Sequence, residues 1–343
     1  MARDHGFHKI RVNRVIQETP DTRSYVLETP FRYRAGQFVT FRVAGALRSY
    51  SMSSSPDTDT ELTTTVKRVP GGLVSNWMHD HLTAGDVVDV TAPAGVFCLR
   101  ESTAPLVAFA GGSGITPIIS LAKSALATTE RRVRILTANR DAASVIFRAA
   151  LDDLAQRHSG RLEVRYHLDT ASGFVTKAEV LDFTGTDGDA DFYLCGPAPF
   201  MGLIERVLLA RGTDPGQIFI ERFTTEDAEQ PAAELSPAVS PTTGSPATGA
   251  HPGGTITIIL NGKRASVART AGITLLQSAR RAGLSPPFSC EAGNCATCIG
   301  RVTEGEVKMR ANNALDDDEI ADGWTLTCQS DPVTADVTVV YED

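Results

Sequence analysis

The segment from Cys290 to Cys298 reads CEAGNCATC, and a fourth cysteine follows at Cys328. This C-x4-C-x2-C spacing with one distant cysteine is typical of a plant-type 2Fe–2S cluster. The loop is built of small residues, and Gly293 can adopt a positive φ, so backbone N–H groups can approach the sulfurs. A zinc ribbon is the alternative, although it usually carries two C-x2-C pairs. We therefore predict a cluster held by Cys290, Cys295, Cys298 and Cys328.

The composition of the 343 residues is that of an ordinary water-soluble chain with two or three domains. The net charge of −8 argues against a nucleic-acid partner. No apolar run approaches the length of a membrane span, and the N-terminus lacks a signal peptide. Clustered cysteines favour metal or redox chemistry over disulfides. We expect a cytoplasmic monomer.

The clearest boundary is residues 226–254, which are rich in Pro, Ala, Ser, Thr and Gly and show no hydrophobic period. Such a segment buries too little apolar surface to offset the entropy of ordering, so we predict a flexible linker. It separates a C-terminal domain, residues 255–343, from the rest. A linker of this kind would let that domain move as on a tether.

The residues before the linker change pattern once. Residues 1–103 contain short β-branched runs separated by Pro, Gly and Asp, which predicts a small antiparallel β-barrel. In residues 104–225, apolar strands such as Ile218–Glu221 alternate with helical stretches such as Phe200–Ala210, which predicts an α/β domain with a parallel sheet. The segment 255–343 mixes strands with one helix, as in an α+β domain.

A glycine-rich turn, GGSGITP, runs from Gly111 to Pro117 after an apolar strand. Backbone amides at the start of the following helix would face an anionic diphosphate, and Pro117 suits a first helical position. A tight turn without a ligand is the alternative, and the sequence does not fit the G-x-G-x-x-G fingerprint. The turn alone is weak evidence for a nucleotide site, but three other motifs strengthen it: Arg48-Ser49-Tyr50-Ser51, Gly71 to Asn76, and Cys195-Gly196-Pro197.

These four motifs, in this order, resemble the ferredoxin–NADP reductase superfamily, here with a C-terminal plant-type ferredoxin domain, which implies a β-grasp fold. The resemblance implies that Tyr50 packs on the flavin ring, that Arg48 pairs with its phosphate and that Ser51 lies near N5. The other residues that it places at the flavin are Ser49, Lys67, Gly72, Leu73, Val74 and Ser75. A solvated strand face is the alternative for Lys67 and Arg68.

The same resemblance implies a nicotinamide site. It assigns Gly112, Ser113, Gly114, Thr116, Gly196 and Pro197 to the nucleotide, and Phe223 to the other face of the flavin. Cys195 would lie near the nicotinamide ring, which makes Ser51 and Cys195 the expected catalytic residues; a buried structural thiol is the alternative for Cys195. Arg140 and Asp141 follow a strand where the adenosine ribose is expected, and they point to opposite cofactors. We favour NADH over NADPH.

The domain order resembles that of phthalate dioxygenase reductase, the phenylacetyl-CoA epoxidase reductase and the reductase component of 3-ketosteroid 9α-hydroxylase. It implies FAD, a 2Fe–2S cluster and a terminal oxygenase partner, with hydride from NAD(P)H divided into single electrons. Two alternatives stay open: a stand-alone diaphorase and a redox sensor. The acidic run from Asp316 to Glu319 could steer a basic partner, although we favour a solvated face.

Overall fold

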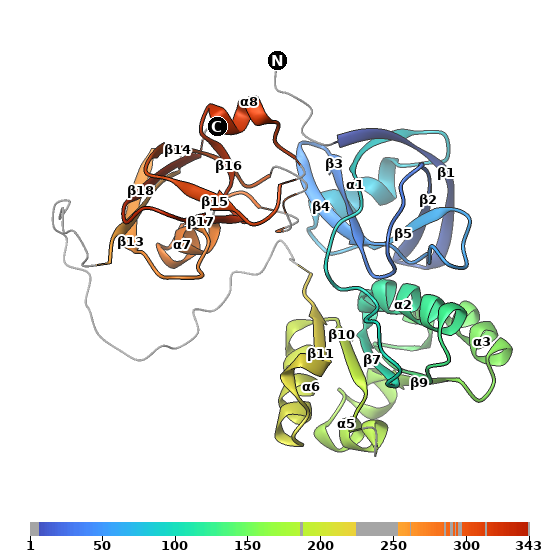
Figure 1. The fold of residues 1–343 in the computed structure, drawn as a ribbon. Coiled ribbons are helices and arrows are strands. Elements are labelled where there is room, and N and C mark those ends of the chain that lie inside the picture. Colours follow the sequence, from blue (N-terminus) through green and yellow to red (C-terminus); the bar gives the residue numbers. More distant parts are fainter. Residues whose placement is uncertain are drawn as a thin grey trace. The chain divides into compact units, whose positions relative to one another are not determined.

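The computed structural model describes residues 7–185, 188–223, 253–260, 262–284, 286–288, 291, 293, 297–312 and 314–341. Phe7–Phe223 form one compact unit, and the described residues from Gly253 onward belong to a second (Figure 1). The predicted linker lies outside the described residues, apart from Gly253 and Gly254.

The first part of the N-terminal unit is an antiparallel sheet of six strands in the order β4-β3-β6-β1-β2-β5. A bridge between Met52 and Thr64 joins the chain after β4 to β5 at the far edge, so the sheet closes into the predicted barrel. Buried Tyr25, Phe41 and Met78 fill its interior. The strands and the helix of the barrel are β1 (Phe7–Thr19), β2 (Thr22–Glu28), β3 (Phe38–Val43), β4 (Ala46–Ser51), β5 (Leu62–Lys67), α1 (Leu73–His81) and β6 (Val87–Thr91).

The second part of this unit is a parallel sheet of five strands in the order β11-β10-β7-β8-β9. Helices cover both faces, as predicted: α2 and α3 pack on one, α5 and α6 on the other. The strands are β7 (Leu106–Gly111), β8 (Val133–Asn139), β9 (Leu162–Leu168), β10 (Asp191–Cys195) and β11 (Ile218–Glu221). The helices are η1 (Gly112–Gly114), α2 (Ile115–Thr128), η2 (Ala142–Ser144), α3 (Arg148–Arg157), α4 (Asp169–Ser172), α5 (Lys177–Thr184), α6 (Ala198–Ala210) and η3 (Pro215–Gln217).

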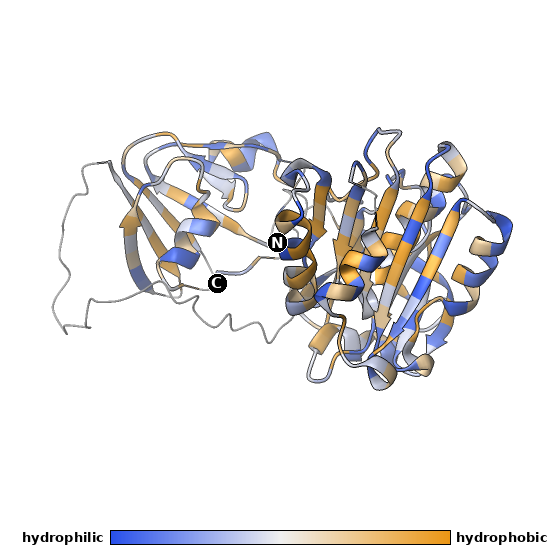
Figure 2. Cartoon of the chain, turned by 90° about the horizontal axis from the view of Figure 1, so that it is seen from below, coloured by the Kyte–Doolittle hydropathy of each residue, from blue (hydrophilic) through white to orange (hydrophobic). Residues whose placement is uncertain are grey.

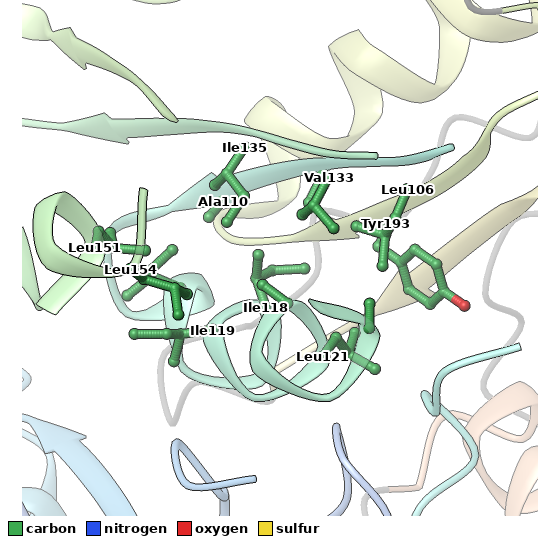
Figure 3. Close-up of a cluster of buried hydrophobic side chains, with 14 of the residues drawn as sticks. Leu106, Ala110, Ile118, Ile119, Leu121, Val133, Ile135, Leu151, Leu154 and Tyr193 are labelled. Carbon is green, nitrogen blue, oxygen red and sulfur yellow. The ribbon is translucent and has the colours of Figure 1, made fainter. Parts of the chain in front are cut away.

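Helix α2 is buried on two sides. Its apolar side chains belong to the core cluster of the sheet: Ile118 points toward Val133 and Ile135, and Ile119 lies beside Leu154 of α3 (Figure 3). Its polar side contacts the barrel through several hydrogen bonds and an ion pair. Ser120 Oγ donates to the carbonyl of Ser54 (2.6 Å), Ser124 Oγ bonds Ser55 Oγ (2.7 Å), and Lys123 Nζ pairs with Asp59 (3.0 Å). The helix thus fixes the barrel against the sheet.

The C-terminal unit has the predicted α+β architecture of a β-grasp domain. A mixed sheet in the order β13-β12-β18-β14-β16 packs against α7, and β15 pairs with β17 beside it. In this unit, as in the other, hydrophobic residues concentrate along the strands while the helices carry both kinds (Figure 2). The elements are β12 (Thr255–Leu260), β13 (Lys263–Ala268), α7 (Leu275–Arg281), β14 (Ile299–Glu304), β15 (Val307–Met309), α8 (Asp317–Ala321), β16 (Trp324–Leu326), β17 (Ser330–Pro332) and β18 (Val337–Tyr341).

The acidic run has a local structural role. Asp316 Oδ1 accepts from the backbone N–H of Glu319 (2.9 Å), and Glu319 Oε2 accepts from that of Asp316 (3.0 Å). This capping box starts α8, and acidic residues in the first turn also suit the helix dipole. Among the described residues, no helix is long and apolar enough to cross a membrane.

Candidate functional site

Two turns meet at the carboxyl-terminal edge of the parallel sheet, where open α/β sheets bind ligands. A Cβ on Gly114 would overlap the carbonyl oxygen of Cys195, and a Cβ on Gly196 would lie 2.8 Å from the backbone nitrogen of Gly111. Only glycine allows this close approach. The structure therefore brings the glycine-rich turn and the Cys195-Gly196-Pro197 turn together, although they are far apart in the sequence.

The glycine-rich turn leads into α2 through the short helix η1. Gly112 has a φ of +52°, which favours glycine, and Thr116 Oγ1 donates to the carbonyl of Ser113 (3.0 Å). We expected Pro117 at the first helical position. The helix begins at Ile115, however, so Pro117 occupies its third position. No side chain in the described part of the chain caps α2. Its N-terminus can thus receive the oxygens of a diphosphate.

Strand β4 carries the Arg48–Ser51 motif on the barrel. Ser51 is buried, and its hydroxyl has no hydrogen-bond partner among the described residues. Tyr50 packs edge-on against Phe41 with ring centroids 5.9 Å apart, and Ser49 Oγ bonds Thr40 Oγ1 (2.8 Å). A buried hydroxyl left in this state is expected where a bound group supplies the missing partner. Ser51 therefore fits a flavin edge.

The start of α1 fits a diphosphate through its backbone. Gly72 is its N-cap, with Leu73, Val74 and Ser75 in the first turn, and no described side chain caps it. The hydroxyl of Ser75, one of the residues expected at the flavin, accepts from the N–H of Val69 (3.2 Å). This turn back toward the preceding loop is favoured because it satisfies a backbone donor.

The two cations at the end of β5 have different surroundings. Arg68 donates to Asn76 (3.1 Å) and pairs with Asp80 (2.6 Å) along α1. Lys67 Nζ lies 3.7 Å from Asp21 and 3.9 Å from the position that a Cβ on Gly112 would take. Lys67, which the resemblance placed at the flavin, thus lies beside the glycine-rich turn and adds positive charge there.

The carboxylate of Asp21 interacts electrostatically with both Lys67 and Arg140, and Arg140 follows β8. Burial alone would raise its pKa, but a hydrogen bond from Thr19 and the charges of Lys67 and Arg140 hold the pKa below its usual value. Arg140 itself pairs with Asp141 (Nε to Oδ2, 3.0 Å), and Asp141 Oδ1 accepts from the N–H of Ser144 (2.9 Å). The charge of Arg140 is therefore already matched by a neighbouring carboxylate.

Cys195 ends β10 and is fully buried. Burial, reinforced by the carboxylate of Glu221, raises the pKa of its thiol well above the ordinary value, so the thiol stays protonated. Phe223, two residues beyond the end of β11, is half-buried against the core cluster that contains Cys195. Cys98 is also buried.

Glu221 is a functional candidate that we did not predict. It lies opposite Cys195 in the parallel register of β10 and β11, and burial raises the pKa of its carboxyl to about 7. The sequence held a signal, because an acidic residue ends a strand whose carboxyl end reaches the ligand-binding edge. A carboxyl with this pKa can hold or release a proton near neutral pH.

Of the four cysteines predicted to hold the cluster, Cys298 and Cys328 lie in the described residues, and both are buried. They share one hydrophobic cluster with Leu276 and Leu326. Thr327 connects them, because its backbone N–H and its hydroxyl both donate to the carbonyl of Cys298 (3.1 and 2.8 Å). Cys290 and Cys295 lie outside the described residues. The fold thus brings together the distant fourth cysteine and the end of the cysteine loop.

These features define a modular oxidoreductase with a flavin barrel, a nucleotide-binding sheet and an iron–sulfur domain. Comparison with known proteins agrees. Residues 9–98 match the oxidoreductase FAD-binding domain, residues 109–206 the oxidoreductase NAD-binding domain, and residues 258–333 the 2Fe-2S iron-sulfur cluster binding domain. Phthalate dioxygenase reductase shares the fold, with a TM-score of 0.59, 23% identity and 98% coverage of both chains.

The curated relatives specify the family. The chain is 36% identical to the ferredoxin reductase component of 3-ketosteroid-9-alpha-monooxygenase from Mycolicibacterium smegmatis, over 98% of this chain and 97% of that one. It is 31% identical to the glycine betaine monooxygenase reductase subunit of Pseudomonas aeruginosa, over 98% and 96%. It is 30% identical to one of the subunits of 1,2-phenylacetyl-CoA epoxidase from Escherichia coli, over 98% of each chain. The chain belongs to this family of NAD(P)H-dependent electron-transfer reductase components of oxygenase systems.

Proposed function

We propose that this chain takes hydride from a nicotinamide cofactor and delivers single electrons to a separate terminal oxygenase. When bound, the flavin converts the electron pair of a hydride into single electrons that a 2Fe–2S cluster can carry. The observation that carries the proposal is the meeting of the glycine-rich turn with Cys195 at one edge of the sheet. Relatives that match over nearly their full length are named as reductase components of two different monooxygenases, which supports an oxygenase as the partner.

The barrel would hold FAD through β4 and α1. In this proposal Tyr50 offers a flat aromatic neighbour and Arg48 a cation, and the backbone amides of Val74 and Ser75 offer donors to the diphosphate. Ser51 contributes the buried hydroxyl described above, directed to the ring edge. The paired state of Ser49 and the inward bond of Ser75 suggest that these two side chains support the site from behind.

The sheet would hold the nicotinamide nucleotide. Gly112, Ser113, Gly114 and Thr116 form the turn at the diphosphate, with Lys67 beside it as a counter-charge. Cys195, as a protonated thiol, would orient the nicotinamide ring without adding charge, and Gly196 and Pro197 would shape the pocket. Glu221 can exchange a proton with a nearby group at neutral pH. Since Arg140 is matched by Asp141, we propose NADH as the preferred donor.

The test begins with the cofactors of the purified protein. We expect about one FAD and one 2Fe–2S cluster per chain. Cys295→Ser should remove the cluster and leave NADH oxidation by ferricyanide intact, whereas Cys98→Ser, at a buried cysteine without a motif, should keep both cofactors. Zinc in place of iron and sulfide would refute the cluster assignment.

The partner is tested by turnover. We expect steady NADH oxidation coupled to substrate hydroxylation only when a purified terminal oxygenase is present. Rapid turnover with small acceptors and none with any co-purifying oxygenase would favour the stand-alone diaphorase. Tight binding of a regulatory target with slow turnover would favour the redox sensor.

A further inference from the structure

The side-chain amide of Gln329 lies between two parts of the cluster ligand set. Its Nε2 is 2.6 Å from the backbone carbonyl oxygen of Glu291 and 3.5 Å from the sulfur of Cys328. Glu291 directly follows Cys290 in the sequence, while Cys328 is the distant fourth cysteine. A single side chain therefore spans from the start of the cysteine loop to the ligand that approaches from elsewhere.

The partners fix which end of the amide faces the site. A backbone carbonyl only accepts hydrogen bonds, so the group 2.6 Å from Glu291 must be the –NH₂ end of Gln329. That group has two hydrogens, one for the carbonyl and one for the sulfur. The amide thus acts as a double donor.

The carbonyl that anchors Gln329 is itself held in place. Glu291 has a positive φ of 46°, which is uncommon for a residue with a side chain. Its carboxylate forms a two-pronged ion pair with Arg280 at the end of α7 (2.8 and 3.1 Å). The guanidinium of Arg280 also lies 3.9 Å from the ring centroid of Phe288. Helix α7 therefore holds the backbone against which Gln329 is aligned.

The nearby tyrosine is engaged differently. Tyr341 is buried, and its hydroxyl bonds Thr327 Oγ1 (2.9 Å), which in turn donates to the carbonyl of Cys298. It supports the backbone of the site through Thr327. Gln329, in contrast, directs a donor at a ligand sulfur.

We propose that Gln329 is a positioning residue that orients Cys328 and favours the reduced cluster, an inference that rests on the cluster assignment above. Reduction by one electron adds negative charge to the cluster and its sulfurs. A hydrogen bond to a ligand sulfur stabilises this added charge, and such bonds are among the features that set iron–sulfur potentials. Without the amide, the reduced form is less stable and the potential falls.

The experiment compares the intact protein with Gln329→Met, which keeps the length of the side chain but has no donor, and with Gln329→Glu, whose carboxylate cannot donate at neutral pH. The control is Asp331→Asn, two residues along the chain in β17, where Asp331 pairs with Arg310 (2.6 Å). Iron and sulfide content, the potential of the cluster and the EPR spectrum of the reduced protein are measured for each.

In both Gln329 variants we expect a loaded cluster with a lower potential and a changed EPR spectrum. The equilibrium constant for reduction should fall several-fold, up to about tenfold, which corresponds to about 59 mV for one electron. The control should show no decrease. An unchanged potential in loaded variants would overturn the proposal, as would loss of the cluster from both variants while the control stays loaded. A parent protein without iron and sulfide would instead refute the cluster assignment.

Discussion

Glu221 shows how position in the fold gives one residue its chemistry. In the sequence it is an acidic residue at the end of a short strand, but in the structure it lies level with Cys195 at the ligand-binding edge. Burial raises its pKa to about 7, so it is protonated in the folded protein at pH values where the unfolded chain has released the proton. This difference links the stability of the protein to pH.

We predict that Glu221→Gln alters the pH dependence of unfolding. Because the folded pKa is raised from 4.5 to about 7, the parent should lose stability as the pH rises through this range and then level off. The variant lacks this loss, which is on the order of 3 kcal/mol, since each pKa unit between 4.5 and about 7 contributes about 1.4 kcal/mol. The measurement is the Tm of both proteins from pH 4 to 9. The exposed Glu163→Gln is the control; if its Tm difference from the parent varies with pH as strongly as that of Glu221→Gln, the assignment is wrong.

We also predict that nucleotide choice depends on Arg140 and Asp141. Asp141 pairs with Arg140 and so reduces its attraction for a 2′-phosphate. We expect a kcat/KM for NADH at least about tenfold above that for NADPH, and a smaller ratio in Asp141→Asn, since that change frees the arginine. Asp153→Asn, which affects an exposed pair with Arg157, should leave the ratio unchanged. A parent enzyme that prefers NADPH would contradict the proposal.

The carboxyl ends and the amino ends of the parallel strands form two sides of the sheet with different roles. The carboxyl-terminal edge carries the glycine turns, Cys195 and Glu221. At the opposite edge Asp191, which starts β10, forms a buried ion pair with Arg131 (2.7 Å), and Arg131 also donates to the carbonyls of Arg100 and Ala104. Both partners of the ion pair are almost inaccessible to solvent. The residues of this edge stabilise the sheet that positions the site.

At this edge we predict a large loss of stability for Asp191→Ala, about 3–5 kcal/mol, because Arg131 would keep a buried charge without its partner. Asp182→Ala, which removes an exposed partner of Arg165, should change stability by less than about 1 kcal/mol. Urea unfolding of both variants provides the measurement. Equal losses in the two variants would show that burial does not determine the strength of the Asp191 pair.

Element by element, the sequence predicts strongly patterned segments and misses weak ones. Ile218–Glu221 is a strand as predicted, because apolar β-branched residues dominate it. The residue pattern alone did not predict β4 or the short strand β16. Both are held by pairing with neighbouring strands, which local propensity does not encode.

The residues of the candidate site likewise divide into those that the sequence predicted and those that it did not. The glycine-rich turn led to Gly114 because it follows an apolar strand, whereas Cys195 and Ser51 were expected only because their motifs resemble those of the reductase superfamily. The sequence did not reveal that Ser75 turns back to Val69, nor that Lys67 lies beside Gly112. These details depend on contacts between elements, and so does the pKa of Glu221, which reflects the sum of its buried surroundings.

At the scale of the whole molecule, we predict that the segment 226–254 works as a tether for the C-terminal domain. As a flexible coil of roughly 29 residues it would span about 30 Å on average, at about 5–6 Å × √n. This reach would let the domain exchange between the flavin edge and an oxygenase. Progressive deletions within Pro231–Pro252 should therefore slow oxygenase-coupled turnover more than ferricyanide turnover, which needs only the flavin.

The control for these deletions is a linker of the original length with shuffled sequence, which should support normal rates. If removal of most of the segment changes neither turnover, the tether is passive and the domains deliver electrons without exchange.

Helix α2 has one more consequence, which concerns how the protein loses its structure. Because one side of the helix belongs to the core of the sheet and the other is bonded to the barrel, neither part can melt while the other keeps α2 in place. We therefore expect barrel and sheet to unfold in a single cooperative transition, and the C-terminal unit, which has a hydrophobic core of its own, to unfold in a separate one. On heating, the C-terminal domain and the barrel with its sheet would then unfold at different temperatures. Partial thermal inactivation could thus abolish electron delivery to the oxygenase while hydride transfer to the flavin continues, or the reverse.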